Sequence, residues 1–243
     1  MLLYIVDFIR LRYIFIFFVL AQTLWKQIKM MPIFVDLKDK KVVIFGGGEL
    51  GSWKAKKFLE GGCEKILIVS KNFSEEIKSL RDNVEVIQRD LTKGFGDLLK
   101  GAFIVVPATN DEELNDAIRE ESVKRGILTN HRAGDLFLSS VVRDGNIEIA
   151  ISTGGHSPAV SKYLKVKLEK FLGNKFDEMA ELQEKIRKIL MDEIENRDER
   201  KEILWEILND DKIWESANLE EALKIARKHV RKRYGDRPFD TIT

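Results

Sequence analysis

The stretch that decides the fold is KVVIFGGGELGSWKAKKFLEGG, residues 41–62. Its first five residues are apolar and β-branched, which is typical of a buried strand, and its second half has helical spacing. Between them, Gly46, Gly48 and Gly51 match the pattern G-x-G-x-x-G. In a strand-to-helix turn, the first glycine permits the tight turn and the second lets a pyrophosphate approach the backbone. The third glycine lets helix and strand pack closely.

This turn predicts a dinucleotide-binding site. Its candidate cofactor contacts are Gly46, Gly47, Gly48, Glu49, Leu50 and Gly51. The next strand ends in Ser70 and Lys71, where NAD-binding proteins usually carry an acidic residue for the ribose hydroxyls. Both are further candidate contacts, and Lys71 would suit a 2′-phosphate. We therefore expect NAD as the cofactor, and the choice between NAD and NADP stays open.

Composition limits the function classes. The 243 residues are 33% charged and carry a net charge of +1, which does not favour nucleic acid as a partner. The single cysteine, Cys63, excludes an intramolecular disulfide, and no cysteine and histidine cluster has the spacing of a zinc site. We expect a cytoplasmic protein without a resident metal.

Residues 1–30 differ from the rest of the chain. Their apolar run, YIFIFFVLA at 13–21, has nine residues, whereas a membrane span needs about 20. We interpret 1–30 as a leader upstream of the true start, with a weak membrane anchor as the alternative. Membrane association is expected only if this leader is translated and retained.

From Ile33 onward, short apolar runs alternate with helical patterns. The pattern predicts parallel strands at 41–45, 66–70, 84–88 and 103–107, separated by helices at 53–59, 74–80 and 112–125. Such alternation is typical of an α/β fold with a Rossmann-like, doubly wound parallel sheet. We expect this dinucleotide-binding domain to cover 31–113.

The remainder of the chain has a different pattern. Residues 114–156 include an alternating stretch, NIEIAIST at 146–153, and they form the second expected segment. From 157 to 243 we expect a helical C-terminal domain, with helices at 162–172, 177–196, 198–208 and 219–233. Its apolar stripes predict helix-to-helix packing.

Four motifs in order resemble the precorrin-2 dehydrogenase and sirohydrochlorin ferrochelatase family of siroheme synthesis. They are the stretch from MPIFVDL to FLEGG (31–62), VVPATNDEELN (105–115), GILTN (126–130) and AISTGGHSPAVSKYL (150–164). The resemblance implies a Rossmann-like domain, a dimerisation segment at 114–156 and a helical C-terminal domain. It implies oxidation of precorrin-2 to sirohydrochlorin, with a hydride passed to NAD and loss of protons. Some members also insert ferrous iron, so iron is a further candidate substrate. The expected partners are the tetrapyrrole and a second copy of the chain.

The resemblance also indicates where the ligands bind. Thr109 and Asn110 follow the fourth strand, where they would contact the nicotinamide, cap the next helix, or do both. A tetrapyrrole with eight carboxylates needs cations around a flat apolar floor. Cations in or beside the motifs are His131, Arg132, Arg143, His156 and Lys162. The expected substrate contacts are Asn130, Arg132, Ser152, Thr153, Gly154, Gly155, His156 and Ser157.

The catalytic group is the point at which the chain departs from the family. Members commonly carry an aspartate in a stretch resembling N-x-x-D, and this aspartate is credited with proton removal. Here Ala133 stands at that position, three residues after Asn130. Either Asp135 takes the role after a shift of the loop, or His131 does, or the carboxylate has been lost. The alternative function is a catalytically inactive NAD(P)-binding sensor or regulatory protein.

Overall fold

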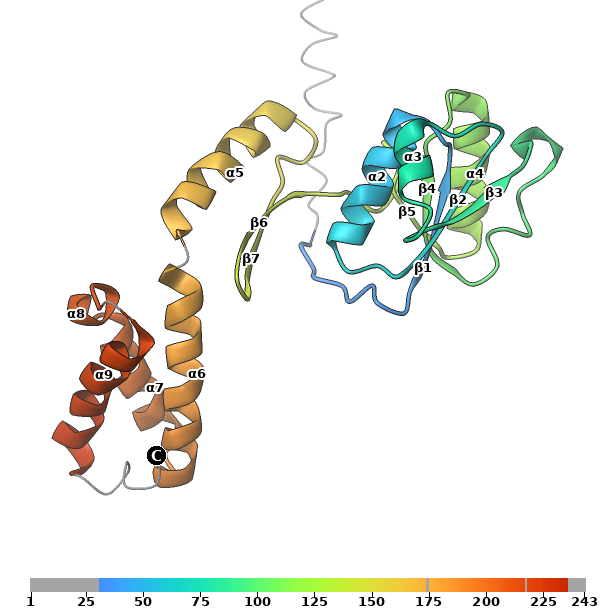
Figure 1. The fold of residues 1–243 in the computed structure, drawn as a ribbon. Coiled ribbons are helices and arrows are strands. Elements are labelled where there is room, and N and C mark those ends of the chain that lie inside the picture. Colours follow the sequence, from blue (N-terminus) through green and yellow to red (C-terminus); the bar gives the residue numbers. More distant parts are fainter. Residues whose placement is uncertain (1–30, 174, 217, 236–243) are drawn as a thin grey trace, which may run out of the picture. The chain divides into compact units, whose positions relative to one another are not determined.

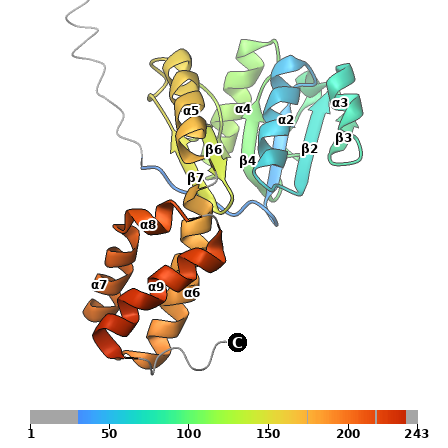
Figure 2. The ribbon, with the colours of Figure 1, turned by 60° about the vertical axis from the view of Figure 1, so that its left-hand side comes forward.

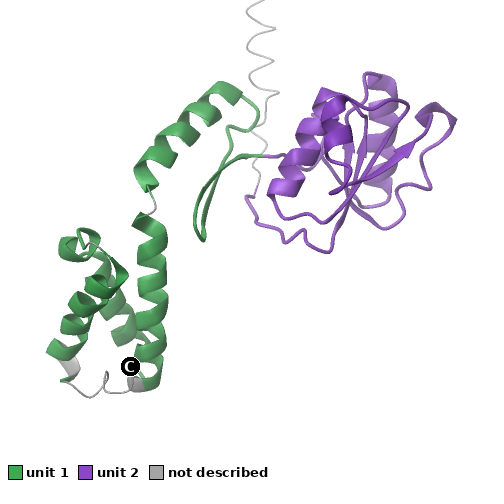
Figure 3. Cartoon of the chain, viewed as in Figure 1, with its two compact units in different colours: residues 1–30, 139–243 green, residues 31–138 purple. Residues whose placement is uncertain are grey.

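The computed structural model describes residues 31–173, 175–216 and 218–235. The expected leader at 1–30 lies outside these residues. The described chain divides into two compact units, of which unit 2 covers Met31–Leu138 and unit 1 begins at Ser139 (Figure 3). None of the helices in the described part of the chain is long and apolar enough to cross a membrane.

Unit 2 contains a five-stranded parallel sheet in the order β3-β2-β1-β4-β5. The strands are β1 (Lys41–Phe45), β2 (Lys65–Ser70), β3 (Glu85–Gln88), β4 (Ala102–Pro107) and β5 (Leu128–Thr129). The chain runs from β1 outward to β3 and then returns to β4 beside β1. This reversal makes the β1–β4 junction the switch point at which an open α/β sheet binds its ligand. The predicted Rossmann-like fold is confirmed.

Helices cover both faces of this sheet (Figure 1). They are α2 (Glu49–Glu60), α3 (Glu75–Ser79) and α4 (Glu112–Lys124), with a 3-10 turn, η1, at Leu91–Lys93. Alternate residues of each strand point to opposite faces, so Val42 packs with Phe58 of α2 and Phe45 lies in the core that contains Ile118 of α4. Strands β1, β2 and β4 are therefore buried on both faces, as their continuous apolar runs predict.

Unit 2 extends beyond the expected domain boundary at residue 113. Helix α4 packs against β4, and β5 pairs with β4 in parallel, with Ile104 opposite Leu128. The chain then returns to the face covered by α2, where Leu136 and Leu138 pack against the core. The segment up to Leu138 is thus part of the sheet domain because it completes the sheet and one of its two cores.

Unit 1 begins with an antiparallel hairpin of β6 (Ser140–Asp144) and β7 (Ile147–Ile151), and α5 (Pro158–Leu172) packs against β6. The helices that follow in the described residues are α6 (Lys175–Glu193), α7 (Arg197–Leu208), α8 (Asp211–Trp214) and α9 (Leu219–Tyr234) (Figure 2). Their core contains Met179, Leu182, Ile186 and Leu190 of the predicted α6 stripe. The helical C-terminal region is confirmed.

Candidate active site

The glycine turn after β1 is fixed by packing at two of its glycines. The Gly46 amide donates to the carbonyl oxygen of Val69 at 2.9 Å, and Gly46 has a φ of 129°. A Cβ on Gly46 would lie 2.1 Å from the carbonyl oxygen of Ala108, and one on Gly51 would lie 2.1 Å from that of Gly46. These two glycines allow β1, β4 and α2 to approach closely, as the fingerprint predicts.

Gly48 is different because the space around it is open. Apart from its own neighbours along the chain, no atom of the described residues lies within 4 Å of the position that a Cβ on Gly48 would take. A Cβ on Gly47, by contrast, would lie 2.2 Å from the carbonyl oxygen of Asn72. Gly48 is the N-cap of α2 and makes no side-chain cap, and Glu49 and Leu50 form the first helical turn. An uncapped helix N-terminus with room beside its backbone fits the pyrophosphate of a dinucleotide.

A carboxylate from beyond β3 lies next to the end of β2, which the local sequence did not show. Lys71 forms an ion pair with Asp90, with 3.1 Å between Nζ and Oδ1, and Asp90 lies just beyond β3. Hydrogen bonding from Thr92, and then from Lys71, holds the pKa of Asp90 below its usual range. Because β2 and β3 are parallel neighbours, Asp90 stands next to Ser70 and Lys71. This placement follows from strand pairing, which the local sequence does not show.

Thr109 lies in a turn that is held by a buried asparagine. The Thr109 hydroxyl lies 2.8 Å from Asn115 Oδ1, and the Thr109 amide donates to the same oxygen at 3.0 Å. The helix cap is Asp111, whose Oδ1 accepts from the Leu114 amide. Thr109 therefore does not cap α4 itself, and Asn110 is an exposed residue at the carboxyl edge of the sheet.

Both catalytic candidates lie in the loop after β5. Asp135 Oδ1 accepts from the Thr129 amide at 2.7 Å, so Asp135 folds back onto the end of β5. His131 also follows this strand, and its Nδ1 lies 3.4 Å from the Ala133 amide. Ala133 is exposed at the outer part of the loop. Asp135 is thus held at the carboxyl end of β5, four residues after His131 in the same loop. Its second carboxylate oxygen, Oδ2, makes no hydrogen bond within the described structure.

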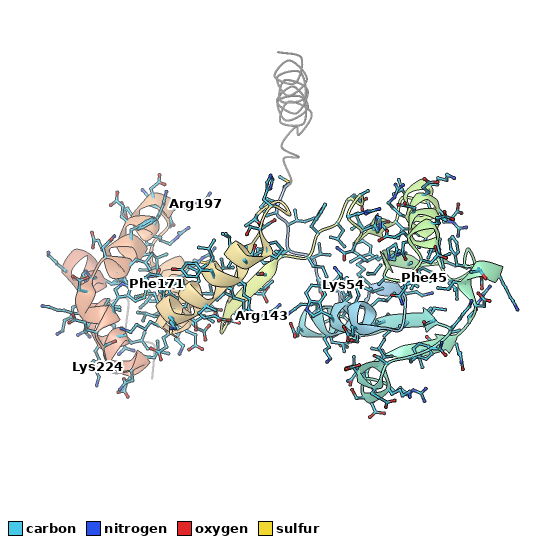
Figure 4. The ribbon with its side chains drawn as sticks, turned by 90° about the horizontal axis from the view of Figure 1, so that it is seen from above. Phe45, Lys54, Arg143, Phe171, Arg197 and Lys224 are labelled. Atoms are coloured by element: carbon cyan, nitrogen blue, oxygen red, sulfur yellow. The ribbon has the colours of Figure 1, made fainter. Side chains whose placement is uncertain are left out.

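Asn130 is committed to contacts inside the protein. Its side chain donates through Nδ2 to the Leu136 carbonyl at 2.8 Å and accepts through Oδ1 from Lys54 Nζ at 2.6 Å. Burial lowers the pKa of Lys54, which projects from α2 (Figure 4). Lys54 was not among the predicted site residues, because its partner lies 76 positions further along the chain.

Six of the predicted substrate residues, 152–157, form the turn before α5 in unit 1. Ser157 caps α5 by accepting from the Val160 amide at 3.3 Å, and the Thr153 hydroxyl accepts from the Ser157 amide at 3.1 Å. His156 Nδ1 lies 2.8 Å from the Thr153 carbonyl oxygen. Left-handed backbone at Gly154 and Gly155 completes the turn, and the Gly154 amide donates to the Ser152 hydroxyl at 3.1 Å.

Comparisons with known proteins identify the family. A family model described as putative NAD(P)-binding matches residues 33–136. A precorrin-2 dehydrogenase from Methanosarcina barkeri is 38% identical over 197 residues, which are 78% of this chain and 87% of that protein. The chain belongs to the precorrin-2 dehydrogenase family. A solved structure of SirC, a precorrin-2 dehydrogenase, aligns with a TM-score of 0.63 and 27% identity over 82% of this chain and 100% of that one.

Longer members of the family contain additional sequence. A siroheme synthase from Buchnera aphidicola is 31% identical over 82% of this chain, but the match covers only 43% of that protein. What this chain shares with the siroheme synthases is therefore less than half of their length.

Two of the predicted cationic residues have carboxylate partners. Arg132 lies 3.4 Å from Glu112 in unit 2, and Arg143 lies 2.6 Å from Glu148 across the β6–β7 hairpin in unit 1. All four side chains are substantially exposed, so these pairs exchange readily with solvent and with a ligand. Within the described ranges, no group of three or more His, Cys, Asp or Glu side chains could hold a metal ion.

Proposed function

We propose that this protein oxidises precorrin-2 to sirohydrochlorin with NAD as the hydride acceptor. The observation that carries the proposal is the shared sheet edge, where the open glycine turn at Gly48 and the loop bearing His131 and Asp135 both follow carboxyl ends of strands. The relative from Methanosarcina barkeri supports the substrate, since this chain matches most of its length. An anaerobic assay of the full chain with precorrin-2 and NAD tests the proposal, and an unchanged precorrin-2 spectrum would refute it.

The glycine turn would hold the cofactor, which supplies the hydride acceptor when bound. Residues 46–51 fit the pyrophosphate, and Thr109 and Asn110 lie on the side proposed for the nicotinamide. Asp90 neutralises Lys71 and would repel a 2′-phosphate, so this pair favours NAD over NADP. Parallel titrations with the two cofactors test the preference, and tighter binding of NADP would contradict it.

We assign the proton-accepting role to Asp135. Its Oδ1 is fixed by the Thr129 amide, which leaves Oδ2 to face a ligand, while the expected family aspartate is replaced by Ala133. Asp135→Asn keeps an oxygen acceptor for Thr129 but removes the base, so turnover should fall about 100-fold or more with folding intact. His131→Gln is the matched variant. If turnover falls strongly in His131→Gln but stays near the wild-type rate in Asp135→Asn, the proton-accepting role belongs to His131.

Each unit has its own proposed substrate contacts. They are Arg132 in unit 2 and, in unit 1, the turn of Ser152, Thr153, Gly154, Gly155, His156 and Ser157. Iron insertion is a second proposed step with ferrous iron as the substrate. That step needs a group that accepts pyrrole protons as the metal enters, and Asp135 is the candidate. Addition of ferrous iron to the anaerobic reaction should then give siroheme, and this product should be lost in Asp135→Asn.

A homodimer is the proposed assembly, through the β6–β7 hairpin and α5. A two-stranded hairpin is marginally stable by itself, and alternate residues of β7, namely Ile147, Ile149 and Ile151, are only half-buried. On α5, Val160, Tyr163 and Leu164 are at least 40% exposed. A second copy of the chain would cover this apolar surface.

A further inference from the structure

Lys54 occupies a defined position at the carboxyl edge of the sheet. It stands in the second turn of α2, and its Nζ donates to Asn130 Oδ1 at 2.6 Å. The orientation of the Asn130 amide is fixed because its Nδ2 donates to the Leu136 carbonyl. Asn130 is 7% exposed, so the acceptor that holds Lys54 is part of the folded core rather than a mobile surface group.

The charge of Lys54 is incompletely compensated. An ammonium group has three donors, and one of them is used by a neutral amide. Burial lowers the pKa of Lys54, and none of the carboxylates in the described structure forms an ion pair with it. By contrast, Lys57, one turn further along α2, pairs with Glu60 at 2.6 Å. A partly desolvated cation without an anionic partner is stabilised when an anionic ligand binds.

The ammonium group of Lys54 lies away from the proposed site of the cofactor phosphates. Asn130 follows β5, which lies two strands away from β1, with β4 between them. At about 4.8 Å between neighbouring strands, the end of β5 lies roughly 10 Å from the end of β1, where the glycine turn begins. The pyrophosphate belongs at that turn, so an anion bound at Lys54 lies on the side of β4 and β5.

The surface next to Lys54 suits a flat apolar ligand. Leu50 lies one turn before Lys54 and Trp53 precedes it directly, and the two apolar side chains are 51% and 47% exposed. Lys54 Nζ lies 4.9 Å from the centre of the Trp53 ring. A broad apolar surface beside a cation matches a macrocycle that carries carboxylates at its rim.

We propose that Lys54 binds a side-chain carboxylate of the tetrapyrrole, and that Asn130 is the positioning residue that holds Lys54 toward it. This assignment rests on the proposed function. It gives Asn130 an indirect role in substrate binding, through Lys54, and it adds a substrate contact from α2.

Lys54→Gln tests the assignment, with Lys57→Gln as the matched control on the same helix. Glutamine retains a donor for Asn130 but removes the charge. The dissociation constant for sirohydrochlorin and the KM for precorrin-2 should rise about tenfold or more, with the dissociation constant for NAD within about twofold of wild type. Added salt should weaken sirohydrochlorin binding more in wild type than in Lys54→Gln. Lys57→Gln should behave as wild type.

Asn130→Asp provides the second variant if Lys54→Gln does not fold. It gives Lys54 an internal carboxylate, which would compete with the ligand and weaken sirohydrochlorin binding while NAD still binds. Unchanged sirohydrochlorin binding in the folded variants would overturn the assignment, as would a selective loss of NAD binding, which would place Lys54 on a cofactor phosphate. Turnover of the wild-type chain distinguishes failure of the proposed function from failure of the Lys54 assignment. If the protein does not oxidise precorrin-2, the wild-type chain is inactive, whereas a wrong Lys54 assignment leaves the wild-type chain active.

Discussion

Gly46 and Gly48 lie two residues apart but have different structural constraints. Alanine at Gly46 would adopt a left-handed φ and place its Cβ 2.1 Å from the Ala108 carbonyl oxygen. We expect Gly46→Ala to lower the free energy of unfolding by at least about 3 kcal/mol. The added methyl group of Gly48→Ala meets no atom within 4 Å among the described residues beyond its chain neighbours. This variant should therefore lower the free energy of unfolding by about 1 kcal/mol or less, but weaken NAD binding about tenfold or more. Thermal unfolding and NAD titration check both, and equal destabilisation by the two variants would contradict the distinction.

The residues of the site could be predicted where they belong to one short sequence motif. The glycine fingerprint spans six positions, and both the tight packing of Gly46 and Gly51 and the open space at Gly48 agree with it. The Lys71–Asp90 and Lys54–Asn130 contacts were not predictable, because strand pairing and helix packing create them between distant parts of the chain. Position in the fold, rather than residue type, gives Lys54 and Asp90 their proposed roles.

Asp210 provides a pH-dependent contact in the helical part of unit 1. Its Oδ2 lies 2.7 Å from His229 Nε2, and hydrogen bonding from His229 holds the pKa of Asp210 below its usual value of 3.8. A carboxyl group whose pKa is lower in the folded state than in the unfolded state stabilises the fold at pH values above its unfolded-state pKa. This stabilisation is lost as the pH falls through the folded-state pKa. Asp210→Asn keeps the cap of α8 but should cost roughly 1 kcal/mol at pH 6.

The difference in unfolding free energy between wild type and Asp210→Asn should shrink between pH 6 and pH 3. Chemical denaturation at the two pH values, followed by the helical circular dichroism signal, measures it. A difference that is the same at both pH values would show that His229 does not stabilise the ionised carboxylate.

At the scale of elements, how well the sequence predicted a strand depended on the length of the strand and on how deeply it is buried. The strands β1 to β4 were predicted within one residue at each end, because β1, β2 and β4 contain continuous buried apolar runs and β3 contains the β-branched pair Val86 and Ile87. Strand β5 was missed since it has two residues, and β6 was missed since it follows directly on the irregular loop after Asp135. β5 also pairs with a distant segment, since Leu128 lies opposite Ile104, and the local sequence does not show such a partner.

The α5 surface yields a prediction about assembly. Leu164 is 40% exposed and lies one turn from Val160, within the proposed dimer surface. Leu164→Glu places a charge there and should shift the chain from dimer to monomer, with its helical content preserved. Sedimentation velocity measures this change. A wild-type chain that is already monomeric, or a dimer unaffected by Leu164→Glu, would contradict the proposed surface.

At the scale of the whole molecule, cofactor binding and oxidation are expected to need different lengths of chain. The family model matches 33–136, which nearly coincides with unit 2 at 31–138. Its sheet, both cores and the glycine turn lie within those residues. We expect residues 31–138 to fold alone and bind NAD, but not to oxidise precorrin-2, since the turn at 152–157 is absent. Calorimetry and the anaerobic assay check this, and full activity of 31–138 would contradict it.

The central claim is that this chain oxidises precorrin-2 with NAD, and a stoichiometric anaerobic assay tests it most directly. The full chain is mixed with precorrin-2 and NAD, and the absorbance of sirohydrochlorin and of NADH is followed in the same sample. Equal amounts of the two products should appear together, and Gly48→Ala should slow both to the same extent. A folded wild-type protein that binds NAD yet forms neither product would contradict the claim and favour an NAD(P)-binding sensor.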